Sequence, residues 1–202
     1  TYMNGTPVTT GNGNSIPFSF GGTSQVSTLL FPAGSFGAVP SGLGINKIYF
    51  AAYTPIAPVQ TTYSGFTVKI GNTTSTTLTT ALVTPLTTAI NNASSYTINP
   101  QSSTWFVINL NTAVLYDPTQ SLVVELSYCG RTQASVWYLA FGAPGGTQWR
   151  NYGSTACNAT SNTTANSGNN YYFGFDLVNL IPPASPVANF YLPTTGCHLT
   201  PT

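Results

Sequence analysis

Few side chains in this chain are suited to acid–base catalysis. The only histidine is His198, close to the C-terminus. A Ser-His-Asp arrangement needs a base that the fold holds in place, and a histidine in a terminal tail lacks that support. Glycoside hydrolysis needs two facing carboxylates, whereas Asp117 lies in a predicted turn and Glu125 and Asp176 lie in predicted strands. The sequence therefore predicts a protein that is not an enzyme.

Metal ligands are just as sparse. Zinc sites use closely spaced His and Cys residues, but Cys129, Cys157 and Cys197 are far apart. A calcium site would depend on backbone carbonyls and Asn, because few carboxylates are present. Asp117 is the best single ligand candidate, and its alternative role is a turn residue that hydrogen-bonds nearby backbone. We expect no metal and no cofactor.

The scarcity of charge also limits the partners. Charged residues make up 3% of the chain, against about a quarter in an ordinary soluble domain. A net charge of +1 cannot track a phosphate backbone, so no nucleic acid is expected. The chain has no basic amphipathic helix and no apolar run of about 18 residues, so we expect no direct membrane insertion.

Four of the seven charged residues fall inside predicted strands, namely Lys47, Lys69, Glu125 and Asp176. One hypothesis is that they pair across neighbouring strands. The other is that they face outward, keep the strand faces soluble and discourage edge pairing. Alternation places Lys69 and Glu125 opposite the bulky apolar faces, and we favour the second hypothesis on that ground.

The fold class follows from the strand patterns. Trp105–Leu110 and Leu122–Leu126 alternate strongly around a turn at Asp117, and we expect them to form a core hairpin. With no convincing helix, the chain reads as an all-β antiparallel β-sandwich, jelly-roll-like, of about ten strands. The remaining predicted strands are Ser15–Phe20, Gln25–Phe31, Ile45–Tyr53, Tyr63–Gly71, Tyr96–Ile98, Ser135–Phe141, Thr147–Tyr152 and Tyr171–Leu180. Segment 84–92 has room for one helical turn at most, GAPGG at 142–146 reads as a hairpin loop, and 156–170 reads as a mobile loop.

Composition divides the chain into four parts. Residues 1–14 read as a flexible leader, 15–180 as the sandwich domain and 181–186 as a proline linker. Residues 187–202 hold either one extra strand or the start of a truncated domain. The chain begins at Thr1 rather than at Met, which suggests a processed or cropped chain.

Three cysteines suggest an extracellular location. We expect Cys129 and Cys157 to pair, which leaves Cys197 unpaired or bonded to another domain or chain. The alternative is three free thiols in a reducing compartment. Glycosylation is compatible with this location, because five Asn-x-Ser/Thr sequons occur, at Asn4, Asn72, Asn92, Asn158 and Asn162.

Two further features suggest partners. Aromatic residues gather in the C-terminal third, and Trp137, Trp149, Tyr152 and Tyr171 are candidates for stacking on a glycan, although such rings more often pack a core. An apolar segment beyond the linker could be donated to the open sheet edge of another subunit, as in a filament. Its residues are Val187, Ala188, Asn189, Phe190, Tyr191 and Leu192.

A succession of short motifs resembles a β-sandwich module of large secreted cell-surface proteins of Bacteroidetes. The motifs are IPFSF at 16–20, INKIYF at 45–50, FTVKIG at 66–71, YDPTQSLVVEL at 116–126 and FGFDL at 173–177. The segment ASPVANFYLPTTGC at 184–197 looks like the start of a PKD-type Ig-like domain. The resemblance implies an adhesin-like or structural part of a larger protein, exported by type IX secretion. It transfers no catalytic motif, and the sorting domain of that route is not among these residues.

Together these features predict a non-enzymatic extracellular, cell-surface module with an adhesive or structural role. Its expected partners are other domains or subunits of a surface assembly. The alternatives are a filament subunit and a carbohydrate-binding module.

Overall fold

The computed structural model describes most of the sandwich region. The described residues are 1–6, 12–14, 17–18, 24–53, 60–78, 85–101, 104–132, 139–142, 148–152, 157, 164–167 and 171–180. For 12–14, 140–141, 148–152 and 164–167 only the backbone is described.

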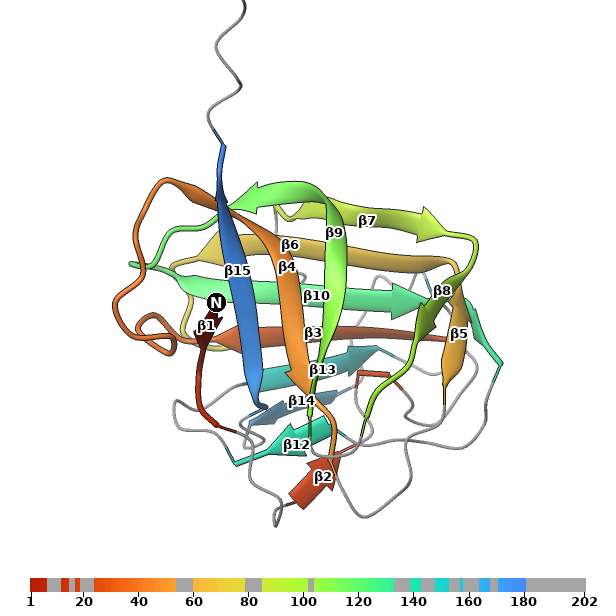
Figure 1. Ribbon diagram of the computed structural model, residues 1–202. Helices are drawn as coiled ribbons and strands as arrows, with labels where there is room; N and C mark the ends of the chain where they lie inside the picture. The colour runs from red at the N-terminus through yellow and green to blue at the C-terminus, as the bar shows by residue number, and fades with distance from the viewer. Residues whose placement is uncertain are drawn as a thin grey trace, which may run out of the picture.

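Two antiparallel sheets form the body of the molecule, and the described residues contain strands but no helix. The four-stranded sheet has the order β1 (Tyr2–Met3), β15 (Phe173–Asn179), β4 (Leu43–Ala51) and β9 (Trp105–Leu115). The six-stranded sheet has the order β14 (Thr164–Ser167), β13 (Gln148–Tyr152), β3 (Gln25–Phe31), β10 (Ser121–Tyr128), β6 (Phe66–Thr73) and β7 (Thr87–Ala93). The strands of one sheet cross those of the other steeply (Figure 1).

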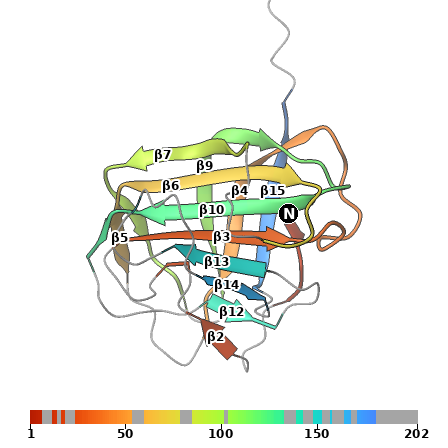
Figure 2. The same cartoon turned by 180° about the vertical axis from the view of Figure 1, so that it is seen from behind.

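Two small sheets lie beside this body. The first has the order β11 (Gly130–Arg131), β5 (Thr61–Ser64) and β8 (Tyr96–Ile98). The second pairs β12 (Leu139–Phe141) with β2 (Asn12–Asn14). Seen from behind, β12 and β2 follow below β13 and β14 at one margin of the six-stranded sheet (Figure 2).

The strand pairing is that of a jelly roll. Four antiparallel pairs are nested in the sequence: β6 with β7, β4 with β9, β3 with β10, and β1 with β15. Successive pairs fall alternately in the six-stranded and the four-stranded sheet, as they do when one long ribbon is folded in half and rolled up. The β13–β14 pair extends the six-stranded sheet beyond β3. The structure thus confirms the predicted all-β sandwich and specifies its topology.

Aromatic side chains fill the space between the sheets. Phe173 of β15 stacks on Phe31 of β3 with ring centroids 4.4 Å apart, and it meets Phe50 of β4 edge-on at 5.0 Å. All three side chains are fully buried. Replacing one such ring by Ala typically costs about 3–5 kcal/mol, so this contact between the sheets contributes strongly to the stability of the sandwich.

The predicted core hairpin is wrong. Trp105–Leu110 is part of β9, Leu122–Leu126 is part of β10, and these two strands lie in different sheets. The turn at Asp117 therefore carries the chain from one sheet to the other. Alternation gives each strand an apolar face but does not say whether the two faces lie side by side or opposite each other.

Several other expectations also differ from the structure. The strand predicted at 63–71 is divided at Gly65, which has a φ of 63° and separates β5 from β6. The segment expected to hold one helical turn forms β7. The GAPGG segment does not close a hairpin, because β12 pairs with β2 while β13 pairs with β14 and β3.

The ends of the sandwich domain also differ from expectation. The leader is not free, since β1 joins β15. Residues 17–18 lie in a turn rather than in a strand, and the segment predicted as a mobile loop contains β14. The linker at 181–186 and the strand donor Val187–Leu192 lie outside the described residues.

Candidate functional site

The outer face of the six-stranded sheet is covered. The residues of β10 that point away from the core are Ser121, Val123, Glu125 and Ser127, and all four are buried. Leu78 and Leu86, from the segments that follow β6, pack against Val123 of β10 and Leu30 of β3. The part of this face over β10 and β3 is therefore closed to a partner, while Lys69 of β6 and Thr88 of β7 stay accessible.

A charged pair lies on this covered face. Glu125 of β10 is the register partner of Lys69 of β6, and Lys69 Nζ lies 3.0 Å from Glu125 Oε1. The side chain of Glu125 is only 8% exposed, whereas that of Lys69 is 40% exposed. Thr28 of β3 donates a longer hydrogen bond, 3.5 Å, to Glu125 Oε2. The charged residues in the strands thus pair, and our preference for unpaired outward-facing charges is wrong.

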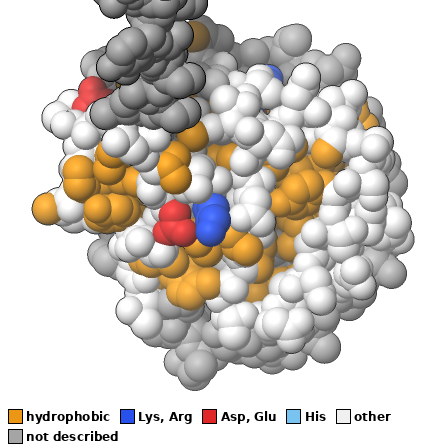
Figure 3. All heavy atoms as spheres, turned by 45° about the horizontal axis from the view of Figure 1, so that its top comes forward, with side chains coloured by type: hydrophobic (Ala, Val, Ile, Leu, Met, Phe, Trp, Pro, Cys, Tyr) orange, Lys and Arg blue, Asp and Glu red, His pale blue; other side chains and the backbone are white. Residues whose placement is uncertain are grey.

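The outer face of the four-stranded sheet is accessible over much of its area. Val107 of β9 is 43% exposed and Leu115, at the end of the same strand, is 55% exposed. Figure 3 shows an acidic and a basic side chain side by side in the middle of this view, with apolar side chains around them. We call the outward-facing residues of β15, β4 and β9 the open face, and the register arranges them in three rows.

The polar row of the open face joins Asp176, Lys47 and Asn109 across β15, β4 and β9. Asp176 Oδ2 accepts a hydrogen bond of 2.6 Å from the hydroxyl of Tyr49 and lies 4.0 Å from Lys47 Nζ. The hypothesis that strand charges pair thus holds on this sheet too, although Lys47 and Asp176 are farther apart than Lys69 and Glu125. The side chain of Lys47 is 42% exposed and Asn109 is exposed, so both keep polar atoms accessible to solvent.

Hydrogen bonds keep Asp176 ionised. Burial raises the pKa of this carboxyl, but hydrogen bonds from Thr1 and Tyr49 outweigh it and hold the pKa below its usual value. Burial also raises the pKa of Tyr49 to about 12, and the hydrogen bond to the Asp176 carboxylate contributes to that rise. At neutral pH the row therefore carries the Asp176 anion and the Lys47 cation beside a protonated Tyr49, and the N-terminal ammonium of Thr1 lies 3.3 Å from Asp176 Oδ1 as a second cation.

An aromatic group adjoins this row. Tyr49 and Val107 form the middle row with Gly174, and the third row places Ala51 of β4 opposite Trp105 of β9. Tyr172 and Ala51 form a small apolar cluster, with the half-buried Tyr53 and Trp105 packed against it. The open face therefore combines two partly accessible aromatic rings, Tyr53 and Trp105, with charged and polar hydrogen-bonding groups.

The predicted glycan-stacking residues are not the ones that the structure places here. Tyr171 is fully buried and packs in the core, so its ring cannot stack on a ligand. Trp137 lies outside the described residues, as do the side chains of Trp149 and Tyr152 in β13. Sequence reasoning missed Trp105 as a surface residue. The alternation of β9 could have identified it, because Trp105 and Val107 point to the opposite side of the strand from the core residues Phe106 and Ile108.

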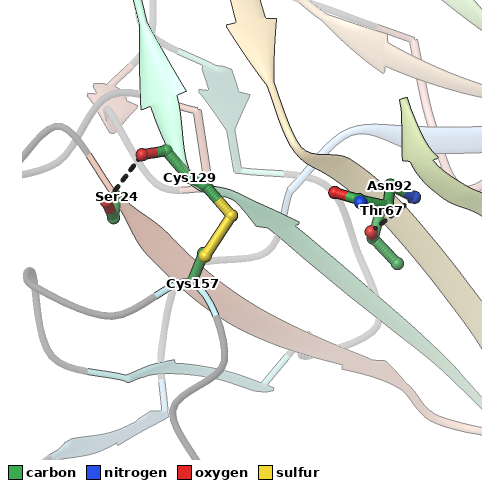
Figure 4. The surroundings of a disulfide bond; sticks show 5 residues. All are labelled: Ser24, Thr67, Asn92, Cys129 and Cys157. Atoms are coloured by element: carbon green, nitrogen blue, oxygen red, sulfur yellow. Dashed lines mark hydrogen bonds between the residues drawn. A yellow bond between two sulfur atoms is a disulfide. The ribbon is translucent and has the colours of Figure 1, made fainter. Parts of the chain in front are cut away.

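The predicted disulfide is present. Cys129 and Cys157 are bonded with a Cα–Cα distance of 4.8 Å across 28 residues of sequence (Figure 4). Ser24 donates a hydrogen bond of 2.9 Å to the carbonyl of Cys129, and the Cys129 amide donates to the carbonyl of Ser64. A Cβ at Gly65 would lie 2.6 Å from the Cys129 sulfur. The bond thus links the end of β10 to a distant segment, while Cys197 lies outside the described residues.

The sequons differ in accessibility. Asn4 is buried, donates to the carbonyl of Tyr171 at 2.7 Å and accepts from the amide of Phe173 at 2.9 Å. It is therefore not a glycosylation site in the folded domain. Asn72 is half-buried and bonds the backbone of Leu115. Asn92 is exposed, and its backbone amide donates to Thr67 (Figure 4), whereas Asn158 and Asn162 lie outside the described residues.

Asp117 has the contacts of a turn residue. Its Oδ1 accepts hydrogen bonds from the amide of Thr119 at 2.9 Å and from the Thr119 hydroxyl at 2.6 Å. Gln120 donates to Oδ2 at 2.9 Å. The bonds from Thr119 contribute most to lowering the pKa of Asp117. Both carboxylate oxygens are engaged within the turn, which favours the structural role over the ligand role.

A buried tyrosine pair lies near the disulfide. The rings of Tyr63 and Tyr128 meet edge-on at 4.9 Å. The hydroxyl of Tyr128 donates to Gln25 at 2.8 Å and that of Tyr63 to the carbonyl of Phe18 at 3.1 Å. Burial raises the pKa of Tyr128 to about 12, and the nearby charge of Arg131 opposes this rise. These hydroxyls are structural donors rather than reactive groups.

Comparison with known proteins does not assign the chain to a family. No protein-family model matches the chain, and no curated protein or solved structure is detectably similar to it. Within the described part of the chain, no helix is long and apolar enough to cross a membrane. In the same residues no three His, Cys, Asp or Glu side chains gather as metal ligands would. The fold and the open face define a disulfide-linked jelly-roll sandwich with one covered and one accessible sheet.

Proposed function

We propose that this chain is a non-enzymatic module of an extracellular cell-surface protein, with an adhesive or structural role. The contrast between the two outer faces carries this proposal. Glu125, on an interior strand of one sheet, is 6% exposed, whereas Val107, on the edge strand β9 of the other, is 43% exposed and the side chain of Lys47, on its interior strand β4, is 42% exposed. A domain that covers one sheet and leaves aromatic and apolar groups on the other has one face suited to contact with a partner.

The location is supported by the disulfide and by the composition. Disulfides persist in oxidising environments outside the cytoplasm, and the Cys129–Cys157 bond links two parts of this domain. With a net charge of +1, electrostatic attraction contributes little to association, so short-range contacts must supply the affinity. The resemblance to secreted modules of Bacteroidetes points in the same direction and adds type IX secretion as the export route.

Bead adhesion tests the role. Beads coated with the protein are applied under flow to films of polysaccharide, of protein and of the module itself, and the retained fraction is measured. We expect retention on at least one film, lost with Val107→Glu on the open face. Thr88→Glu is the matched control, because Thr88 is an exposed strand residue on the other sheet. Equal retention of both variants would refute the role of the open face, and no retention on any film would refute adhesion.

The location is tested on intact cells that produce the protein. A membrane-impermeant amine reagent should label Lys47, whose side chain is 42% exposed. Labelling of Lys47 only after the cells are lysed would place the protein inside the cell and contradict the proposal.

A further inference from the structure

We infer that the open face binds a neutral oligosaccharide or polysaccharide, laid across β15, β4 and β9. This inference rests on the proposed adhesive function and names its ligand class. Three observations lead to it: the pairing of aromatic with polar rows, the ion pairs that engage the charges of the polar row, and the extent of the face.

The aromatic part matches one side of a sugar ring. A pyranose presents C–H groups on its faces, and these pack on the electron-rich faces of Trp and Tyr. Trp105 and Tyr53 are half-buried, so each is held by the protein while part of its surface stays accessible. Ala51 and Tyr172 of the same cluster are buried, so Trp105 and Tyr53 supply the aromatic surface that a ligand can reach.

The polar part matches the rim of a sugar ring. Hydroxyl groups both donate and accept hydrogen bonds. Lys47 supplies ammonium donors, Asn109 supplies a donor and an acceptor, and Asp176 supplies carboxylate oxygens. The Tyr49 hydroxyl, 2.6 Å from Asp176, fixes the position of that carboxylate before any ligand arrives. Groups held in place in this way lose little entropy on binding.

The arrangement of charges favours a neutral sugar. Asp176 lies 3.3 Å from the N-terminal ammonium of Thr1 and 4.0 Å from Lys47 Nζ. Both cations thus already have a carboxylate partner, and an acidic sugar would have to compete with Asp176 for them while being repelled by it. Purely apolar partners would bury the Lys47–Asp176 pair without compensation, which is unfavourable. A neutral ring with many hydroxyls can bond both groups.

The extent of the face selects a chain of sugars over a single one. Asn109 and Trp105, the accessible members of these two rows on β9, are four residues apart, which corresponds to about 13 Å along the strand. This is longer than one hexose ring, so the two rows contact different rings of the same chain.

Affinity electrophoresis in native gels tests the inference. The gels contain dextran, a galactomannan or a mixed-linkage β-glucan, with polygalacturonate as the acidic comparison. We expect retardation by at least one neutral polymer and weaker retardation by polygalacturonate. Trp105→Ala should weaken the interaction about three- to tenfold, as expected for the loss of one aromatic contact, whereas Trp105→Phe should retain most of it. Thr88→Glu on the other sheet should bind like the parent protein.

Two further variants separate ligand contact from folding. Tyr49→Phe removes the hydroxyl that positions Asp176 but keeps the ring, so it should weaken binding while the thermal unfolding midpoint changes little. Asp176→Asn should reduce binding to the neutral polymer and increase retardation by polygalacturonate, because Lys47 then lacks its counter-charge. Unchanged binding by both variants would overturn the assignment of the polar row.

The outcomes also separate this inference from the proposed function. If the beads adhere through the open face to a protein film or to the module itself, but no neutral polymer retards the protein, the glycan inference fails and adhesion stands. Concentration-dependent self-association abolished by Val107→Glu would show that a second copy occupies the face. If no film retains the beads, both proposals fail.

Discussion

Replacing Lys69 by Met should destabilise the protein more than the exposure of Lys69 suggests. The reason is its partner, since the Glu125 side chain is 8% exposed and its short contact is the 3.0 Å ion pair with Lys69. Without Lys69, the remaining contact of the carboxylate among the described side chains is the 3.5 Å hydrogen bond from Thr28. Breaking a fully buried pair in this way costs about 3–5 kcal/mol. Solvent reaches Lys69, which is 40% exposed, so we expect a smaller loss of about 2 kcal/mol.

The measurement is thermal and urea unfolding followed by circular dichroism. For a chain of this length about 2 kcal/mol corresponds to a fall in the melting temperature of roughly 4–8 °C. Lys47→Met is the matched control, because Lys47 is 42% exposed but faces the more exposed Asp176 at 4.0 Å. It should cost less than about 1 kcal/mol. The double variant Lys69→Met with Glu125→Leu should recover most of the lost stability, because no unpaired charge then remains buried.

The control also defines the refuting result. If Lys69→Met costs no more than Lys47→Met, then Glu125 does not depend on its partner. The same conclusion follows if the double variant is less stable than Lys69→Met alone.

Three further predictions concern the disulfide, the sequons and the turn. Replacing both Cys129 and Cys157 by Ser should lower the free energy of unfolding by about 3–4 kcal/mol, given the 28-residue separation; urea unfolding measures the loss, and an unchanged midpoint would contradict the entropic argument. Expression in a glycosylating host should place a glycan on the exposed Asn92 and none on the buried Asn4, as read by peptide mass spectrometry; an occupied Asn4 would mean that β1 is not held against β15. The folded-state pKa of Asp117 is lowered, so its stabilising effect is present above the unfolded pKa of about 4 and is lost as the pH falls further. The difference in melting temperature between the parent and Asp117→Asn should therefore shrink at the lowest pH, and a difference that grows there would show the opposite sign.

The sequence predicted the elements better than their arrangement. Gln25–Phe31 was expected as a strand and is β3 with the same bounds, because Pro32 marks its end. The predicted split of β9 and β10 into apolar and polar faces is also correct. Their placement in different sheets was not predictable, because it depends on the pairing of β9 with β4 and of β10 with β3, and these pairs are distant in sequence.

The candidate site was predictable only in part. The type of ligand surface, aromatic rings beside amides, follows from composition. Its position does not, because Tyr171 and Tyr172 are neighbours in sequence, yet Tyr171 packs in the main core whereas Tyr172 packs with Ala51 on the open face. The burial of Glu125 could not be predicted either, because it depends on Leu78 and Leu86, which pack onto the outer face from other parts of the chain. Alternation identifies the two faces of a strand, but it does not say which of them a distant loop will cover.

The pairing of β1 with β15 has a mechanical consequence for a load applied to both ends of the domain. These strands are antiparallel neighbours, with Tyr2 opposite Phe175, so a pull on residues 1 and 180 acts at the same end of the pair. Such a load opens hydrogen bonds one after another instead of shearing them together, and β1 should detach at low force. Beyond that point the Cys129–Cys157 bond sets a limit to extension. The residues between the two cysteines would span about 95 Å when fully stretched, and the covalent bond withholds that length from the pulled chain. Under load, β1 thus detaches first, and the disulfide then keeps the fully extended domain shorter than its total chain length.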